Sequence, residues 1–455
     1  MSDTPTSLDR RNFLKTAMLA GAAAGWLETP ANAGVLSSKG KSVMGLKAPP
    51  LEKVRVGIVG LGMRGSGAVG RHLLLEGVEI VALCDIRPDK VAAAQKRLTA
   101  KGRAPAKEFG ATPEDYKRMC ELENIDLIYN CTPWYLHTPI SVFAMRAGKH
   151  AVTEVPAATS LEECWDLVNT AEKTQKHCMM LENCCYGENE LLALNLCRLG
   201  MLGELLHGEA AYLHDLRSLK FDDKTGYQGM WRLQFSKKYN GNPYPTHGLG
   251  PVCQYMGINR GDRFDYLTSA STMQRGMTLY AQQKFGPTSP FATDTYRLGD
   301  MNTTLIRTVK GRTIMVQHDT TNPRPYSRIN HIQGTKGVFA DYPPRLALDG
   351  QSEEWIEGDA LKPYFEKYRH PLWAKEGELA KKVGGHGGMD FVMDWRLMTC
   401  LRGGEALDQS VYDAAAWSSV FPLSCKSVAN RSSSVDVPDF TRGVWEHTEP
   451  LPIIS

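Results

Sequence analysis

The chain has 455 residues, of which 42% are hydrophobic and 23% are charged, and this balance is typical of a folded globular protein rather than a disordered or fibrous one. Its formal net charge is only +3 and it contains no basic run, which argues against nucleic acid as the main partner. A chain of this length is expected to form about two to three domains, each able to bury a core of its own.

The N-terminus has the ordered features of an export signal. Arg10 and Arg11 stand as a pair, an apolar stretch covers Ala17–Leu27, and Ala31-Asn32-Ala33 offers small residues for cleavage. We therefore expect residues 1–33 to be a twin-arginine signal peptide, which hands the folded protein to the export machinery for delivery to the periplasm or outside the cell. The other interpretation is an N-terminal helix of the mature fold. No later stretch predicts a transmembrane helix, which takes about 20 apolar residues.

The eleven cysteines do not predict a disulfide framework. Their number is odd, they fall on apolar segments, and a protein that folds before export does so in the reducing cytoplasm. The pair Cys184-Cys185 is adjacent, which is poor disulfide geometry. Because no Cys-x-x-Cys pair comes with a matching histidine cluster, we predict no metal site.

Short β-branched runs alternate with helical patterns after a Gly-, Ser- and Pro-rich linker at 34–51. This alternation predicts a doubly wound parallel sheet of the Rossmann type over residues 52–185. The expected strands are Val54–Val59, Val78–Cys84, Asp126–Cys131, His150–Glu154 and Cys178–Leu181, and the expected helices are 64–75, 88–101, 135–147 and 160–176.

The pattern changes after about residue 185, where longer strands and loops rich in Gly, Pro and Asn begin. Residues 186–455 are therefore expected to form an α+β substrate domain on a largely antiparallel sheet. Its clearest strands are Leu205–Tyr212, Thr303–Thr308 and Arg312–Gln317. Two helices near the end, Met389–Leu401 and Val411–Ala429, are expected to pack back on one of the two domains, and the pattern does not say on which.

A glycine-rich loop follows the first expected strand. Gly60, Gly62 and Gly65 form a G-x-G-x-x-G pattern that opens a helix, whose free N–H groups can meet a pyrophosphate. Asp85 ends the next strand, 20 residues after Gly65, where a carboxylate bonds both ribose hydroxyls and repels a 2′-phosphate. The loop and Asp85 together predict NAD rather than NADP as the cofactor, although a Gly-rich turn can also be purely structural.

Ligands of an open α/β sheet bind at the carboxyl ends of its strands, so the residues that follow the later strands are candidates for the site. Trp134 offers a flat wall for nicotinamide or sugar. His137 can bond a ribose or begin the next helix. Glu154, Asn183 and Tyr186 should lie near the nicotinamide ring, and for Glu154 the alternative is a salt bridge at the domain seam.

These residues resemble a known family. The N-terminal half is similar to the Gfo/Idh/MocA oxidoreductases, and the closer resemblance, over nearly the whole chain, is to glycosyl hydrolase family 109, the NAD-dependent α-N-acetylgalactosaminidases. In the wider oxidoreductase family a Glu-Lys-Pro lysine serves as acid and base; here Val155 takes its place, as in the glycosidases. The matching stretches are Gly60–Gly65, Trp134–His137, Glu154-Val155-Pro156, Glu182–Tyr186, Tyr244–Gly248 and His386–Asp390.

The resemblance also implies which residues touch the two ligands. NAD would be contacted by Met63, Arg64, Asp85, Trp134, Tyr135, Leu136, His137, Glu154, Val155 and Asn183. The sugar would be contacted by Tyr212, Arg232, Tyr244, Pro245, Thr246, His247 and Tyr326. A loop that combines aromatic, imidazole and hydroxyl groups with Pro and Gly, as 244–248 does, is a suitable lining for a sugar.

The implied mechanism is hydrolysis of terminal α-N-acetylgalactosamine by oxidation at C3, deprotonation at C2, elimination, addition of water and re-reduction. The cofactor ends as it began, which suits an exported enzyme that carries its own NAD. We expect His247 and Tyr186 to move protons, with Glu154 as a further candidate base, because histidine is the residue type best suited to proton transfer at working pH.

Three other functions stay open at this stage. The first is an NAD-dependent oxidoreductase of sugars or cyclitols, the second a binding module without turnover, and the third a glycosidase for another N-acetylhexosamine or the other anomer. The sequence leaves the oligomeric state open, with a homo-oligomer as one option.

Overall fold

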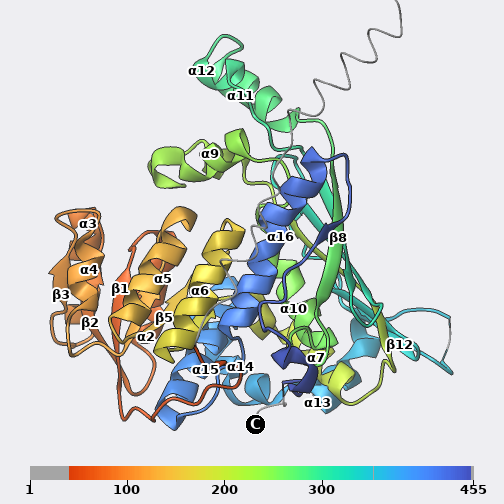
Figure 1. The fold of residues 1–455 in the computed structure, drawn as a ribbon, viewed down its shortest axis with the longest axis horizontal. Coiled ribbons are helices and arrows are strands. Elements are labelled where there is room, and N and C mark those ends of the chain that lie inside the picture. The colour runs from red at the N-terminus through yellow and green to blue at the C-terminus, as the bar shows by residue number, and fades with distance from the viewer. Residues whose placement is uncertain (1–39, 352, 452–455) are drawn as a thin grey trace, which may run out of the picture. The chain divides into compact units, whose positions relative to one another are not determined.

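The computed structural model describes residues 40–351 and 353–451, so the predicted signal peptide at 1–33 lies outside the described residues. A six-stranded, all-parallel sheet of order β3-β2-β1-β4-β5-β6 forms the first half of the described chain (Figure 1). Its strands are β1 (Val54–Val59), β2 (Val78–Cys84), β3 (Lys107–Phe109), β4 (Leu127–Asn130), β5 (His150–Thr153) and β6 (Cys178–Met180). This is the doubly wound Rossmann arrangement expected from the alternating pattern.

The helices of this half connect parallel strands, as crossover helices must. They are α2 (Met63–His72), α3 (Pro88–Ala100), α4 (Asp115–Cys120), α5 (His137–Arg146) and α6 (Leu161–Thr174). The helix α6 begins at a side-chain cap, because the backbone N–H of Glu163 donates to Oγ of Ser160 at 3.2 Å. The strands β4 and β5 are buried along their whole length, which explains their continuous apolar runs.

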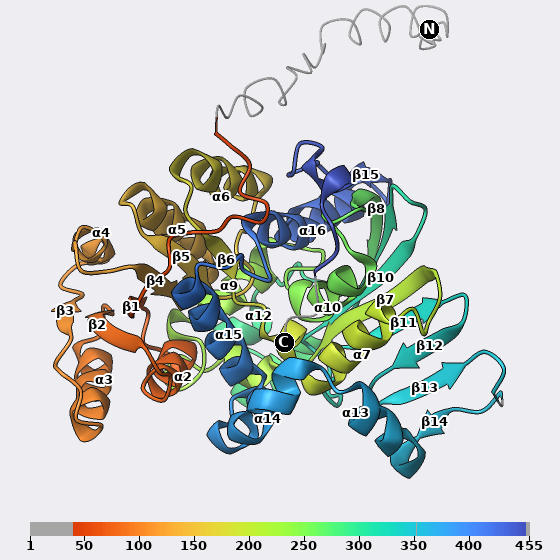
Figure 2. The same ribbon diagram turned by 90° about the horizontal axis from the view of Figure 1, so that it is seen from below.

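A second, nine-stranded sheet has the order β14-β13-β12-β11-β7-β10-β9-β8-β15, and Figure 2 shows several of its strands fanning out beyond β7. All its pairs are antiparallel except the parallel pair β7–β10, so the sheet is mixed but largely antiparallel, as expected. Its strands are β7 (Leu205–Leu213), β8 (Phe264–Ser271), β9 (Asn302–Thr308), β10 (Thr313–Asp319), β11 (His331–Gly334), β12 (Gly337–Ala340), β13 (Arg345–Leu348), β14 (Ile356–Glu357) and β15 (Val435–Asp436).

The two helices near the C-terminus pack on both halves rather than on one. The helix α16 (Val411–Ala429) lies between α6 of the first half and β8 of the second (Figure 1). The helix α15 (Met389–Gly403) packs against α2 and β1. Residues 40–51 belong to the predicted linker, and Val43 N–H donates to the Tyr412 hydroxyl at 3.1 Å. The seam is therefore closed by segments from both ends of the described chain.

The remaining helices of the second half include two that support the site. The helix α7 (Glu188–Arg198) and the helix α10 (Thr246–Met256) pack against each other, and α10 lies on β7. All eleven cysteines are free thiols and none is exposed, as expected. Among the described residues, no helix has the length and apolar character needed to cross a membrane.

Candidate active site

The glycine-rich loop between β1 and α2 has the shape that a dinucleotide pyrophosphate needs. Gly60 has φ +82°, and a Cβ there would lie 2.8 Å from the carbonyl of Cys131. A Cβ on Gly65 would lie 1.8 Å from the carbonyl oxygen of Gly60. A Cβ on Gly62 would meet nothing within 4 Å, so this position is open for a ligand, at the N-terminus of α2. The loop therefore fits NAD.

Asp85 lies at the end of β2, beside this loop. Its Oδ2 atom accepts from the N–H of Leu61 at 2.6 Å and its Oδ1 atom from the N–H of Arg87 at 2.8 Å. The carboxylate is thus held against the loop, in the place where a ribose would meet it. Met63 and Tyr135 are about half exposed, at 53% and 52%, so both side chains are free to contact a bound nucleotide.

His137 has a structural role, which was the second of the two interpretations of this residue. It begins α5 and is 1% exposed, and its Nδ1 and Nε2 atoms lie 2.6 and 2.7 Å from the carbonyls of Pro156 and Thr132. Burial lowers the pKa of the imidazole, although the two carbonyls oppose this shift. Its ring nitrogens are committed to the fold, so the side chain is not available to a ribose. Leu136 closes the short turn before α5.

Glu154 and Asn183 are linked through Arg64 and Asp390: Glu154 binds Arg64, and Asn183 binds the carboxylate of Asp390. Arg64 Nε donates to Glu154 Oε1 at 2.7 Å and Arg64 Nη1 to Asp390 Oδ2 at 2.9 Å. Asn183 Nδ2 donates to Asp390 Oδ1 at 2.5 Å. Glu154 is therefore in a salt bridge, but with an arginine of its own half; it is the second ion pair of Arg64, with Asp390, that crosses the domain seam. Glu154 still follows β5 at the edge of the sheet where a nicotinamide would lie.

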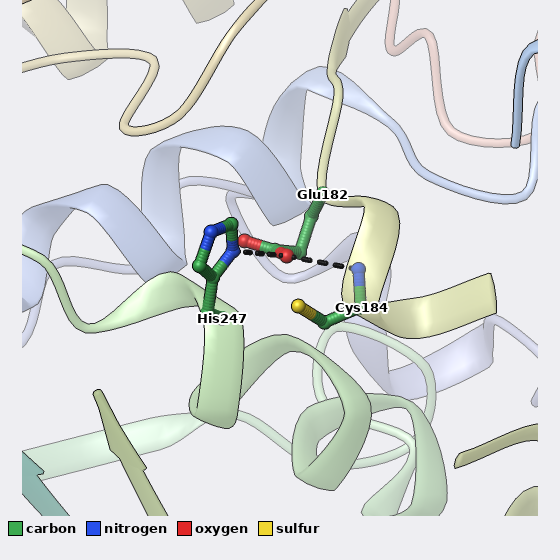
Figure 3. A group of neighbouring side chains, drawn as sticks. All are labelled: Glu182, Cys184 and His247. Carbon is green, nitrogen blue, oxygen red and sulfur yellow. Dashed lines mark hydrogen bonds and ion pairs between the residues drawn. The ribbon is translucent and has the colours of Figure 1, made fainter. Parts of the chain in front are cut away.

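His247 forms a dyad with Glu182, which Figure 3 shows beside Cys184. Its Nδ1 atom lies 2.7 Å from Glu182 Oε1, and its Nε2 atom lies 3.2 Å from the Tyr244 hydroxyl. Glu182 is fully buried. Burial works to raise its pKa, but the charge and hydrogen bond of His247 outweigh burial and the pKa is lowered. An ionised Glu182 accepts the Nδ1 proton, which leaves Nε2 as the proton acceptor of a neutral His247.

Tyr186 lies elsewhere than predicted. Its hydroxyl donates to Asp408 Oδ2 at 3.3 Å, beneath α15, and burial raises its pKa well above the ordinary value. Its backbone carbonyl accepts from the indole N–H of Trp373 at 2.8 Å. The hydroxyl of Tyr186 is bonded to Asp408, and the partners of His247 are Glu182 and Tyr244, so this geometry does not support Tyr186 as a partner of His247 in proton transfer.

The predicted sugar-binding residues form one aromatic box around a buried guanidinium. The centre of the Arg232 guanidinium lies 4.5 Å from the ring of Tyr244, 4.8 Å from Trp134 and 5.7 Å from Tyr212. Trp134 stacks on Tyr244 at 5.4 Å, so the end of β4 supplies one wall of the box. Arg232 Nη1 donates to the Tyr227 hydroxyl at 2.7 Å, whereas Nη2 is buried without a partner. An unpaired buried donor of this kind is suited to a polar ligand.

Tyr326 borders the same box. Its ring lies 6.1 Å from Tyr212, and its hydroxyl accepts from Arg328 Nη1 at 3.0 Å. Pro245 is the N-cap residue of α10, and Thr246, which is fully buried, begins the helix, so this pair positions His247 in its first turn. Burial raises the pKa of Tyr244 well above its ordinary value, and the charges of Glu182 and Glu154 act in the same direction.

Two residues of the site had no predicted role. Glu182 stands in a stretch that matches the family, but its pairing with His247 depends on how α10 packs on the turn after β6. Asp390 lies in another such stretch, 207 residues from its partner Asn183. The sequence offered two signals: Glu182 is a carboxylate directly after the apolar run Cys178–Leu181, and a His-Gly-Gly pattern comes before Asp390.

Glu182, Cys184 and His247 are also residue types that bind zinc, and one donor atom of each lies within 4.8 Å of the others. In this structure the carboxylate is hydrogen-bonded to the imidazole, and burial raises the pKa of the Cys184 thiol well above its ordinary value. The expectation that the protein has no metal site stays a prediction.

Comparison with known proteins identifies the family. Residues 186–447 match the model of the glycosyl hydrolase 109 C-terminal domain, and residues 54–182 match the oxidoreductase family with an NAD-binding Rossmann fold. The chain is 51% identical to "Glycosyl hydrolase family 109 protein 2" of Shewanella sp. (strain ANA-3) over 460 residues, which cover 99% of this chain and 100% of the relative. It is 50% identical to "Alpha-N-acetylgalactosaminidase" of Shewanella oneidensis over 459 residues, 99% of each chain.

Among solved structures, levoglucosan dehydrogenase in complex with NADH and levoglucosan has a TM-score of 0.64 at 19% identity, covering 85% of this chain and 100% of that one. Aldose-aldose oxidoreductase from Caulobacter crescentus has a TM-score of 0.60 at 17% identity, covering 85% and 100%. These two similarities show the fold alone. The two family matches and the curated relatives show that the chain belongs to glycosyl hydrolase family 109, as a glycoside hydrolase with NAD as its cofactor.

Proposed function

We propose that the protein releases terminal α-linked N-acetylgalactosamine from glycans, by a route in which NAD stays bound and is unchanged after each turnover. The observation that carries this proposal is the His247–Glu182 dyad, which opens onto the aromatic box beside the NAD-binding edge of the sheet. The name of the relative from Shewanella oneidensis supports the choice of sugar.

NAD⁺, held by the glycine-rich loop and Asp85, would supply a hydride acceptor for C3 of the sugar, and the resulting 3-ketone would make the hydrogen on C2 acidic until the hydride is returned. The chain must then take up and return the protons of the sugar. His247 suits this work, because its Nε2 atom faces the box while Glu182 holds Nδ1–H and stabilises the imidazolium after protonation. The same arrangement of a carboxylate behind an imidazole orients the ring and selects its tautomer.

The box recognises the sugar through its rings and its cation. Aromatic rings such as those of Trp134 and Tyr244 bind the apolar face of a hexose, and the free Nη2 of Arg232 can donate to an acetamido carbonyl or a ring hydroxyl. Val155 is buried and has no titratable group, so the position that holds a lysine in the related dehydrogenases cannot accept a proton here. This difference favours the glycosidase over a simple sugar dehydrogenase.

We also propose that the protein is exported in the folded state. The residues up to 33 carry the signal features, and the first buried residue of the described chain, Val43, lies beyond the expected cleavage site after Ala33. Mass spectrometry of the protein recovered from the periplasm tests this. A mature chain beginning at Gly34 is the expected result, and an uncleaved chain confined to the cytoplasm would contradict it.

The decisive experiment is hydrolysis of an aryl α-N-acetylgalactosaminide in D₂O without added NAD, followed by NMR of the released sugar. We expect release of the sugar with deuterium at C2, because the C2 proton leaves and is replaced from solvent. Release without deuterium would keep the glycosidase but reject the redox route. No release, with NADH accumulating once NAD⁺ and free sugars are added, would instead establish an oxidoreductase.

A further inference from the structure

Asp390 is a carboxylate from the C-terminal half that lies among residues of the NAD site. It is on the first turn of α15 and is 1% exposed. Its Oδ1 atom accepts from Asn183, which follows β6, and its Oδ2 atom accepts from Arg64, which lies within the glycine-rich loop. Both partners stand at the carboxyl edge of the parallel sheet, where the dinucleotide binds.

Arg64 is held between two carboxylates. Its Nε atom donates to Glu154, and its Nη1 and Nη2 atoms lie 2.9 and 3.4 Å from the two oxygens of Asp390. These contacts fix the side chain of a residue in the first turn of α2, whose N–H groups form the anion site. Burial alone would raise the pKa of Asp390, but a hydrogen bond from His386 and the charges of Arg64 and Arg71 hold it well below the ordinary value.

The glycine-rich segment before α15 has a backbone conformation that lets it pack closely against Asp390. Gly384, Gly385, His386, Gly387 and Gly388 all have positive φ, from +48° to +103°, which L side chains rarely adopt. A Cβ on Gly385 would lie 2.9 Å from Asp390 Oδ2, and one on Gly388 would lie 2.8 Å from the backbone of Ala380. The His386 imidazole, 58% exposed, lies 3.0 Å from Asp390 and 3.2 Å from Arg64. The glycines thus allow the chain to approach Asp390 closely.

A second carboxylate on the same helix, Asp394, serves as a comparison, because it joins α15 to the first half without contacting the cofactor loop. Asp394 is fully buried and lies one turn further along α15, where it accepts from Arg71 Nε at 2.6 Å and from the Tyr129 hydroxyl at 2.8 Å. Arg71 Nη1 also lies 3.6 Å from Asp390 Oδ2, so both carboxylates help to attach α15 to the sheet. The hydrogen bonds of Asp394 go to Arg71 and Tyr129, whereas those of Asp390 reach Arg64 and Asn183 at the cofactor loop, and this is the difference between the two.

We propose that Asp390 is a positioning residue for the cofactor: it fixes Arg64 and Asn183 together, so that NAD binds tightly only when the C-terminal half is docked. The Gly384–Gly388 segment, through His386, supports Asp390 and Arg64 from the solvent side. The inference rests on NAD as the cofactor and not on the identity of the sugar. It can therefore fail while the proposed glycosidase activity holds, and it can hold if the substrate proves to be another sugar.

The test compares Asp390→Asn with Asp394→Asn in the full-length protein. NAD that remains bound after purification is measured after denaturation, and the Kd for added NAD⁺ is measured on the stripped protein by calorimetry. We expect Asp390→Asn to raise the Kd at least about tenfold, because it weakens charge-assisted hydrogen bonds to two cofactor-site residues. We expect Asp394→Asn to lower the melting temperature but to leave the Kd within about twofold.

Two further variants complete the test. Asp390→Glu keeps the charge and should recover part of the affinity, whereas His386→Ala removes an exposed contact without burying a charge and should raise the Kd about threefold. If Asp390→Asn does not fold, His386→Ala decides the question, and an unchanged Kd in that variant would overturn the proposal. Equal effects of the Asp390 and Asp394 variants on the Kd would also overturn it, since the role would then be structural.

Discussion

Nδ1 of His247 lies 2.7 Å from Oε1 of Glu182, and the two residues come from the first turn of α10 and the end of β6. The proton on Nδ1 is thereby directed to the buried carboxylate, and the basic nitrogen Nε2 is directed to the box. Neither residue alone has this property, because an isolated imidazole can carry its proton on either nitrogen.

Glu182→Gln should therefore lower kcat by about 100- to 1000-fold, in the range that general acid–base catalysis contributes. The amide keeps the volume of the side chain but cannot stabilise an imidazolium, so KM and the amount of bound NAD should change little. Steady-state kinetics on protein of known NAD content make the measurement.

Cys184→Ser is the matched control, because this thiol lies beside the dyad but donates to Asn183 Oδ1 rather than to His247. Its kcat should stay within about threefold of the wild-type value. A Glu182→Gln protein that retains more than about a tenth of the wild-type kcat would show that the dyad does not carry the chemistry.

Arg232→Lys should weaken substrate binding more than it slows turnover. The variant keeps the charge but loses the free Nη2 donor and the planar fit between the rings. We expect KM to rise about 10- to 100-fold, the range for loss of a hydrogen bond from a charged group, with a smaller change in kcat. Tyr227→Phe, which removes only the hydroxyl that accepts from Arg232 Nη1, should raise KM much less. Equal effects of the two variants would mean that Arg232 only supports the fold.

The sequence predicted five of the six strands of the first sheet, since each of these is a short, largely apolar run next to helix signals. The strand β3 was missed, because it has only three residues, Lys-Glu-Phe, of which two are exposed. The box and His247 were named correctly as neighbours, but only through the resemblance to a family. Tyr186 shows the limit of topology: it follows a strand at the correct edge, yet the turn after β6 sends its hydroxyl to Asp408.

Two glycines of the cofactor loop should respond differently to the same substitution. Gly65→Ala places a Cβ 1.8 Å from a backbone carbonyl, so the loop must distort, and both the melting temperature and the NAD content should fall. Gly62→Ala meets no protein atom within 4 Å, so the melting temperature of the NAD-free protein should be unchanged. Its Kd for NAD should nevertheless rise about tenfold or more, because the methyl group stands where the pyrophosphate must approach the backbone.

Calorimetry for the Kd and thermal unfolding of stripped protein separate the two effects. A Gly62→Ala protein that binds NAD as tightly as the wild type would place the pyrophosphate elsewhere. A Gly65→Ala protein of normal stability would show that the loop can relax around the added methyl group.

Lys220 should make the stability of the protein depend on pH. Its side chain is buried beneath the box, where Nζ bonds the hydroxyls of Thr320 at 2.7 Å and Ser236 at 3.1 Å. Burial, with help from the charge of Arg232, lowers its pKa from 10.5 to about 7. Between these two values the unfolded chain binds a proton that the folded protein does not, so the free energy of unfolding rises with pH in this window.

The expected gain between about pH 7 and pH 9 is about 2 kcal/mol, and the effect levels off below the folded-state pKa. It is measured as the difference in unfolding free energy between the wild type and Lys220→Met, in urea at several pH values, because other titrating groups cancel in that difference. The unfolding free energy of the wild type should rise relative to that of Lys220→Met as the pH rises. A difference that stays flat across the window would mean that Lys220 remains charged in the folded protein, compensated by the nearby carboxylate of Asp319.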